Sequence, residues 1–146
     1  MTGTTASESV VLQRELPQTR DRVFDWLTEP DKLARWMTPQ GRVEVEADAR
    51  PGGRLSVVMI GEGIRIEHSG HFVEVDRPRR IVFTWNSPFT AGDSLVTIEL
   101  EARGEGTALT LRHERLPDGQ AESHGGGWSA MLGRLAAELG NLTLEV

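Results

Sequence analysis

The stretch SHGGGWSAMLGRLAAELG, residues 123–140, carries the one long helical pattern in this sequence. From Trp128 onward, apolar residues recur at intervals of three or four: Met131, Leu132, Leu135 and Leu139. This spacing places them on one face of an amphipathic helix, and Gly140 stands where such a helix commonly ends. We therefore expect a long final helix whose apolar face covers another part of the fold.

That other part is a β-sheet, because residues 42–115 alternate between apolar and polar side chains. A first, shorter strand is expected at Val10–Glu15. Two short helices follow it, one capped by Thr19 and one that begins near Pro30. The order is one strand, two short helices, about six antiparallel strands and the long final helix, which predicts the α+β class.

Hairpin loops set the registers of two strand pairs. A loop at Glu62–Gly63 pairs Val57 with His68, so the imidazole points toward the inner face of the sheet. A turn at Gly104–Glu105 brings His113 onto the same inner face. Two histidines are therefore expected among otherwise apolar inward side chains.

A third turn, at Asp76–Arg79, sets the register between the two strands beside it. It places Gly70 opposite Trp85, where the missing side chain would leave room for the indole. Regular alternation along this strand also turns Glu74 inward. An inward carboxylate needs a partner or contact with water.

Composition excludes several classes of protein. The net charge of −6, with acidic and basic residues interspersed, argues against a nucleic-acid partner. The chain has no cysteine, hence no disulfide, thiolate nucleophile or zinc finger. It has no apolar run of membrane-spanning length and no signal-peptide pattern, so we expect a cytoplasmic protein without membrane insertion. Residues 1–8 are expected to be flexible and residues 9–146 to form one domain, with no cofactor indicated and the oligomeric state open.

Five stretches, in this order, carry a resemblance to a known family. They are Val23–Trp36 (VFDWLTEPDKLARW), Arg50–Arg54 (RPGGR), Gly70–Trp85 (GHFVEVDRPRRIVFTW), Leu109–Leu116 (LTLRHERL) and Gly127–Leu139 (GWSAMLGRLAAEL). The chain resembles the helix-grip fold of the START and birch-pollen-allergen superfamily (SRPBCC). Within it, the chain is similar to homologues of the C-terminal domain of the activator of heat shock protein 90 ATPase.

The resemblance implies a curved antiparallel sheet that grips the final helix, with an apolar cavity between them. Members of the superfamily bind lipids, sterols, polyketides or other hydrophobic molecules, and some catalyse cyclisation or similar chemistry. The chaperone activator itself carries an additional N-terminal domain that this sequence lacks, so a chaperone partner is less expected than a small hydrophobic ligand. No catalytic signature of the enzyme subgroups is present.

Combined with the strand registers, the resemblance gives a set of candidate ligand-binding residues. The apolar lining is expected from Trp36, Val57, Met59, Phe72, Phe83, Trp85, Ile98, Leu111, Trp128, Met131 and Leu132. Glu74 and His113 would orient the polar end of a ligand. The alternatives are that neighbours satisfy these polar groups, as we expect more strongly for His68, and that the aromatic residues are plain core.

A metal site is not expected. His68 and His71 are three positions apart on a strand, so they point to opposite faces and cannot chelate one ion together. His124, near the start of the final helix, has no second ligand at helical spacing.

The triple glycine Gly125–Gly127 lies within or just before the start of the final helix. Each glycine there costs about 0.5–1 kcal/mol relative to alanine. Our hypothesis is that this weak segment lets the helix open at one end and admit a ligand.

Three functions follow from the sequence. The first is binding of a small hydrophobic molecule, with a stress-related role as one option. The second is an enzyme of cyclase or hydrolase type that uses Glu74 or His113 as general acid or base. The third is a module that regulates a chaperone. The sequence favours the first and leans against an enzyme.

Overall fold

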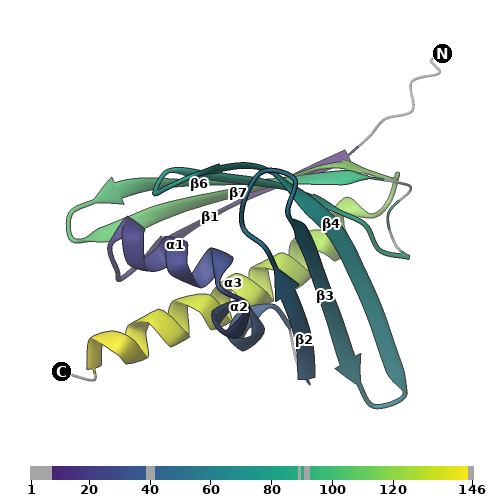
Figure 1. The fold of residues 1–146 in the computed structure, drawn as a ribbon, viewed down its shortest axis with the longest axis horizontal. Helices are drawn as coiled ribbons and strands as arrows, with labels where there is room; N and C mark the ends of the chain where they lie inside the picture. The colour runs from purple at the N-terminus through teal and green to yellow at the C-terminus, as the bar shows by residue number, and fades with distance from the viewer. Residues whose placement is uncertain (1–7, 39–41, 89, 91–92, 145–146) are drawn as a thin grey trace.

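Among the residues that the structure describes, 8–38, 42–88, 90 and 93–144 of a computed structural model, seven antiparallel strands form one curved sheet (Figure 1). The strands are β1 (Glu8–Leu16), β2 (Arg42–Ala47), β3 (Arg54–Gly61), β4 (Ile64–Asp76), β5 (Arg80–Trp85), β6 (Ser94–Arg103) and β7 (Gly106–Leu116). The helices are α1 (Arg20–Thr28), α2 (Pro30–Trp36) and α3 (Ala121–Leu144). This arrangement confirms the predicted α+β helix-grip architecture.

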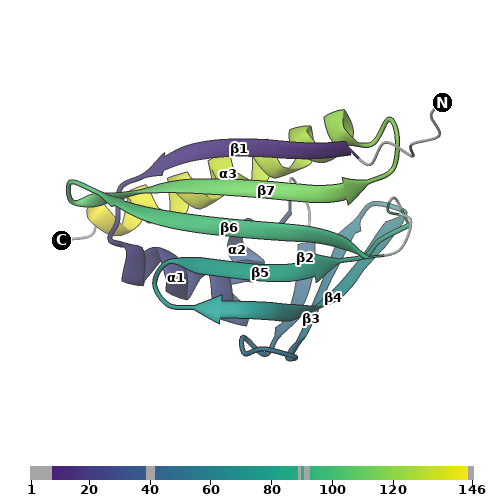
Figure 2. The ribbon, with the colours of Figure 1, turned by 90° about the horizontal axis from the view of Figure 1, so that it is seen from above.

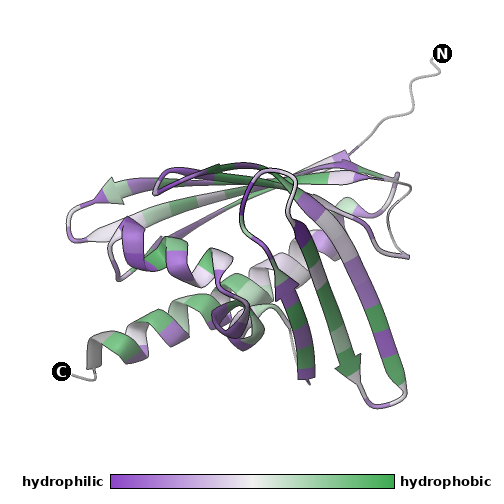
Figure 3. Ribbon diagram, in the orientation of Figure 1, coloured by the Kyte–Doolittle hydropathy of each residue, from purple (hydrophilic) through white to green (hydrophobic). Residues whose placement is uncertain are grey.

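The strand order across the sheet is β1-β7-β6-β5-β4-β3-β2. Seen from above, β1, β7, β6 and β5 run side by side, with α3 behind β1 and β7, while β3 and part of β4 turn away from that plane (Figure 2). The sheet therefore curls around the helices, which all lie on its inner side (Figure 1). Green and purple bands alternate along β2, because its successive side chains face the helices and the solvent in turn (Figure 3).

Two predicted hairpin registers are confirmed and one is wrong in part. Val57 pairs with His68 between β3 and β4, and His113 pairs with Val96 between β6 and β7. Between β4 and β5, the pairing shifts by one residue after Phe72, so that Glu74 lies opposite Val82. A β-bulge of this kind inserts an extra residue and reverses which side chains point inward.

Helix α3 is longer at both ends than its apolar stripe predicts. It begins at Ala121, where the main-chain N–H donates to the carboxylate of Glu8 at 3.1 Å. It continues through Gly140 to Leu144, so the predicted end at Gly140 is wrong. Glycine inside a helix costs only about 1 kcal/mol, and Leu142 packs against the core beyond it. Of the segment predicted to be flexible, residues 1–7 lie outside the described residues, and Glu8 begins β1.

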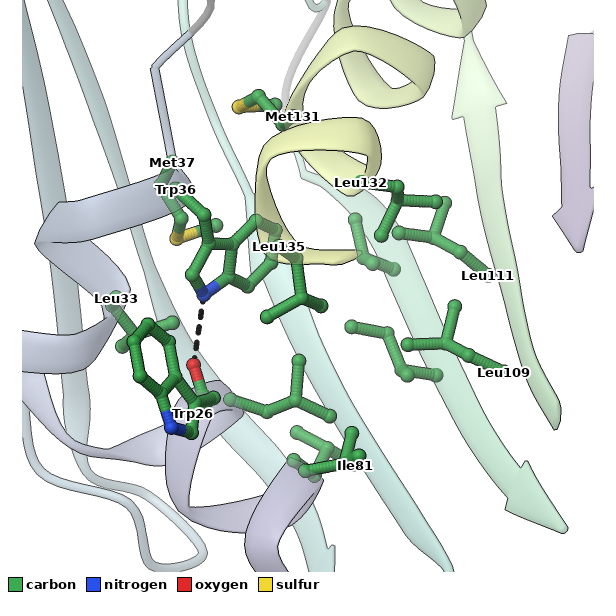
Figure 4. Packing of buried hydrophobic residues seen from close by; sticks show 14 of the residues in the cluster. Trp26, Leu33, Trp36, Met37, Ile81, Leu109, Leu111, Met131, Leu132 and Leu135 are labelled. Atoms are coloured by element: carbon green, nitrogen blue, oxygen red, sulfur yellow. Dashed lines mark hydrogen bonds between the residues drawn. The ribbon is translucent and has the colours of Figure 1, made fainter. Parts of the chain in front are cut away.

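A continuous apolar core fills the space between the sheet and the helices (Figure 4). Trp36 at the end of α2 has no solvent exposure, and its Nε1–H donates to the main-chain oxygen of Trp26 at 2.8 Å. This bond ties α2 to α1 beside α3. Leu135 of α3, also without exposure, packs in the same cluster (Figure 4).

Candidate functional site

A pocket of about 150 Å³ opens beside the first turns of α3. We call it the α3 pocket; its lining residues are Met59, His68, Trp85, Ser123, His124, Gly127, Trp128 and Met131. Three strands and one helix therefore contribute to it: β3, β4, β5 and α3. The glycine-rich segment lies at this end of the helix, where the sequence analysis placed an entrance.

Aromatic rings form the inner wall of the α3 pocket. The imidazole of His68 stacks on the indole of Trp85 with 4.6 Å between ring centroids and 28° between planes. Trp85 in turn contacts Trp128 at 5.3 Å between centroids. Trp85 and Trp128 are only 2% and 1% exposed, so they hold the wall in place and present little surface to solvent.

His68 is buried, but its ring is not fully satisfied. Its Nδ1 lies 3.1 Å from the main-chain oxygen of Val57. A carbonyl oxygen only accepts, so Nδ1 must carry the proton and Nε2 is left as a lone-pair acceptor. Burial lowers the pKa of His68, which favours this neutral form.

His124 has the same arrangement on the helical side of the pocket. Its Nδ1 lies 2.9 Å from the main-chain oxygen of Gln120, one turn earlier in the chain. By the same reasoning, Nδ1–H donates, and in the neutral ring Nε2 is the open acceptor. His124 is half-buried, so it stands nearer the mouth than His68 does.

His113 lies behind the α3 pocket and has no solvent exposure. Trp128 donates its Nε1–H to His113 Nδ1 at 3.0 Å, and His113 Nε2 lies 2.8 Å from the hydroxyl of Ser94. Ser94 donates to the main-chain oxygen of Trp85, so Nε2–H of His113 donates to Ser94. Burial, with smaller contributions from His124 and His68, lowers the pKa of His113 to about 3. His113 was predicted to contact the polar end of a ligand, but both of its ring nitrogens are already hydrogen-bonded, one to Trp128 and the other to Ser94.

Glu74 is on the outer face of the sheet, so its predicted inward position is wrong. The bulge after Phe72 turns it outward, and its carboxylate lies 3.3 Å from Arg80 Nε. Arg80 also pairs with Glu99 at 2.7 Å. These residues line a hollow of about 770 Å³ on the outer face, where acidic and basic side chains alternate.

The remaining candidates belong to the filled core. Trp36, Phe72, Phe83 and Ile98 surround a void of about 10 Å³, which is too small to hold a ligand. Val57, Leu111 and Leu132 are at most 2% exposed and line neither space. The sequence left open whether the inward residues line a cavity or fill a core. Here Met59, Trp85, Trp128 and Met131 line the α3 pocket, and the other inward candidates fill the core.

The sequence matches a family model described as "Activator of Hsp90 ATPase homolog 1-like protein" over residues 17–140. The chain belongs to this family. The match confirms the resemblance carried by the five sequence stretches and places the chain in the SRPBCC superfamily. Among curated proteins, none matches this sequence.

Several solved structures share the fold over most of their length. CV1439 from Chromobacterium violaceum is 29% identical, with a TM-score of 0.80 over 89% of this chain and 96% of that one. Mll3558 from Rhizobium loti is 28% identical, with a TM-score of 0.80 over 91% and 97% of the two chains. CalU16 from Micromonospora echinospora is 25% identical, with a TM-score of 0.74 over 94% and 80%.

In this member of the family, the predicted lining lacked three residues of the α3 pocket: Ser123, His124 and Gly127, of which Gly127 was placed in the entrance. One signal could have found His124, because it lies four residues before Trp128 and seven before Met131, on the same helical face. His68 was expected to point inward but to be satisfied by a neighbour, which holds for only one of its two nitrogens.

Neither a metal cluster nor a membrane helix is found in the described part of this family member. No three or more His, Cys, Asp or Glu side chains among residues 8–38, 42–88, 90 and 93–144 are grouped to hold a metal ion. In the same ranges, no helix is long and apolar enough to cross a membrane.

Proposed function

We propose that this protein binds a small, mostly apolar molecule in the α3 pocket. One observation carries the proposal: beside a filled core, aromatic rings and thioethers surround an open space of about 150 Å³. A cavity of roughly this size can hold a single benzene ring. Burial of apolar ligand surface would drive binding, and a few polar groups would set its orientation.

The larger hollow on the outer face of the sheet is a weaker candidate. Its volume is about 770 Å³, but charged side chains dominate its lining. Several of them already pair with each other, as Arg80 does with Glu74 and Glu99. An apolar ligand would gain little there, and a charged one would have to compete with the existing ion pairs.

Membership of the superfamily supports a ligand in the same region. The resemblance implies that related proteins hold hydrophobic molecules between the sheet and the final helix, which is where the α3 pocket lies. An enzyme that uses Glu74 or His113 is not proposed, because Glu74 is on the outer face and His113 is fully buried. Regulation of a chaperone stays a prediction.

Fluorescence titration with one-ring aromatic compounds tests the proposal, because Trp85 and Trp128 are part of the pocket. We expect a saturable change in tryptophan emission. Two glycine variants make a matched pair: a Cβ at Gly127 or at Gly126 meets no atom within 4 Å, but only Gly127 lines the pocket. Gly127→Leu should weaken binding at least about tenfold, since it fills the space, whereas Gly126→Leu should leave the equilibrium Kd unchanged.

Native mass spectrometry of the purified protein adds an independent readout of any molecule that is already bound. The proposal would be abandoned if no compound in a broad panel of small aromatic and aliphatic molecules gave a saturable response. It would also be abandoned if Gly127→Leu and Gly126→Leu bound ligand as tightly as the unchanged protein.

A further inference from the structure

Two imidazoles of the α3 pocket present the same chemical group to its interior. His68 and His124 each use Nδ1–H on a main-chain oxygen, that of Val57 at 3.1 Å and that of Gln120 at 2.9 Å. In each ring, Nε2 is then a lone-pair acceptor. Among the described residues, no group donates to either Nε2.

These two acceptors are open to the pocket. In the described part of the chain, no buried side-chain nitrogen or oxygen lacks a partner, so Nε2 of His68 is not sealed in the core. Since His68 is only 8% exposed and lines the pocket, the pocket is the space that its free nitrogen reaches. A molecule that fills this space without a donor would strand that nitrogen, which is unfavourable.

Neighbouring rings hold both imidazoles in position before any ligand arrives. His68 is stacked on Trp85. His124 stands edge-on to His113, with 5.1 Å between centroids and 85° between planes. His113 is itself fixed by Trp128. Acceptors that are already oriented lose little conformational entropy when a donor binds.

No charged side chain lines the α3 pocket. An anionic ligand would therefore find no permanent countercharge there and would bring its lone pairs toward the lone pair on Nε2 of each neutral ring. The lowered pKa of His68 means that protonation does not readily supply that countercharge. An uncharged hydroxyl avoids both penalties, because it donates one proton and still has lone pairs for other contacts.

From this geometry, and on the basis of the proposed function, we infer that the α3 pocket selects a hydroxyaromatic ligand. The hydroxyl donates to Nε2 of His68, and Nε2 of His124 is a second acceptor near the mouth. The aromatic ring lies among Trp85, Trp128 and Met131. A one-ring phenol fits the volume of about 150 Å³.

The test compares phenol with toluene, which has the same shape but no donor. Toluene leaves water more readily than phenol, so the two Kd values differ even without a specific hydrogen bond. The informative quantity is therefore the change in the ratio of the toluene Kd to the phenol Kd when a residue is mutated. His68→Phe keeps an aromatic ring against Trp85 but removes the acceptor. We expect this ratio to fall about tenfold in His68→Phe, the size typical of one lost hydrogen bond. In His124→Phe, nearer the mouth, the fall should be smaller.

The outcomes separate this inference from the function on which it rests. If toluene and phenol both bind and the ratio is the same in His68→Phe, the selectivity for a hydroxyl is wrong while the pocket stands. If neither compound nor any other binds the unchanged protein, the proposed function fails. Benzoate should bind more weakly than phenol, and tighter binding of benzoate would overturn the inference.

A measurement on the unchanged protein covers the case in which His68→Phe does not fold. The ¹⁵N NMR signal of His68 Nε2 reports on hydrogen bonds that this nitrogen accepts. Phenol should shift this signal in the direction of a protonated nitrogen, and toluene at equal occupancy should not. Equal shifts with the two ligands, or no shift with phenol, would contradict the inference.

Discussion

At the scale of single residues, His113 shows how burial and hydrogen bonds select one form of a side chain. The indole N–H of Trp128 can only donate, so His113 Nδ1 must accept. Protonation of this nitrogen would place two N–H groups against each other inside the core. Both this conflict and the loss of hydration favour the neutral ring, in line with a pKa of about 3.

The low pKa of His113 makes the stability of the protein depend on pH. The pKa is lowered from 6.5 to about 3, so between these values the unfolded chain binds more protons than the native protein. The free energy of unfolding therefore falls as pH is lowered through this window. Between pH 7.5 and pH 5 we expect His113 alone to cost about 2 kcal/mol, measured by urea unfolding at both pH values.

The control for this prediction is His113→Gln, which retains a donor and an acceptor but does not titrate. It should be less stable than the unchanged protein at pH 7.5, because Gln does not reproduce the geometry between Trp128 and Ser94. Its stability should nevertheless change less between the two pH values, by the same amount of about 2 kcal/mol. An equal change in both proteins would show that His113 does not carry the effect.

At the scale of elements, the sequence predicted strand pairing where a short loop sets it. The loops after β3 and β6 impose the registers that bring His68 and His113 to the inner face. Between β4 and β5 the prediction failed after Phe72, because it carried regular alternation through a bulge. Glu74 was therefore placed on the wrong face. The sequence holds one sign of the shift, since the inward Val75 follows Phe72 by three positions and not by two or four.

The absence of a side chain at Gly70 matters as the sequence predicted, but for a different reason. The sequence analysis assigned its missing side chain to making room for the indole of Trp85. In the structure, a Cβ at Gly70 would lie 1.9 Å from the main-chain oxygen of Thr84, so it is the backbone of β5 that approaches. The close approach of two strands depends on their tertiary arrangement, so the alternation of apolar and polar residues does not predict it.

We expect Gly70→Ala to destabilise the protein by about 1–3 kcal/mol or more, because β4 and β5 must separate to accommodate the methyl group. Gly61→Ala is the matched control in the neighbouring strand β3, since a Cβ there meets no atom within 4 Å. It should change the free energy of unfolding by less than about 0.5 kcal/mol. Chemical denaturation of the two variants checks the prediction, and similar losses in both would contradict it.

The start of α3 allows the entrance hypothesis to be tested apart from the contents of the pocket. Gly126 is exposed and does not line the α3 pocket. Gly126→Ala should therefore stabilise this part of the helix by about 0.5–1 kcal/mol without occupying the space. If the helix must open to admit a ligand, stopped-flow fluorescence should show association and dissociation slowed together at constant Kd. Unchanged rates would rule the entrance out.

At the scale of the whole molecule, the sequence predicted which large apolar residues share the inner face but not how much room remains between them. Met59 and Phe72 follow the same alternation, yet only Met59 borders the α3 pocket. The difference comes from α2, whose Trp36 is locked to Trp26 and fills the interior near Phe72. Packing between elements far apart in the chain decides this, so periodicity alone could not separate lined cavity from filled core.

Because the core is filled and the α3 pocket small, ligand size should be limited. The unchanged protein should bind one-ring aromatic compounds at least about tenfold more tightly than two-ring analogues or a sterol. Met131→Ala enlarges the pocket and should reduce this preference, at a cost of about 2–5 kcal/mol in stability. Leu135→Ala, one turn further along α3, should cost a similar amount but leave the preference intact, since Leu135 does not line the pocket. Fluorescence titrations of the three proteins measure the effect. If the unchanged protein binds a sterol as tightly as a one-ring compound, the ligand does not bind in the α3 pocket.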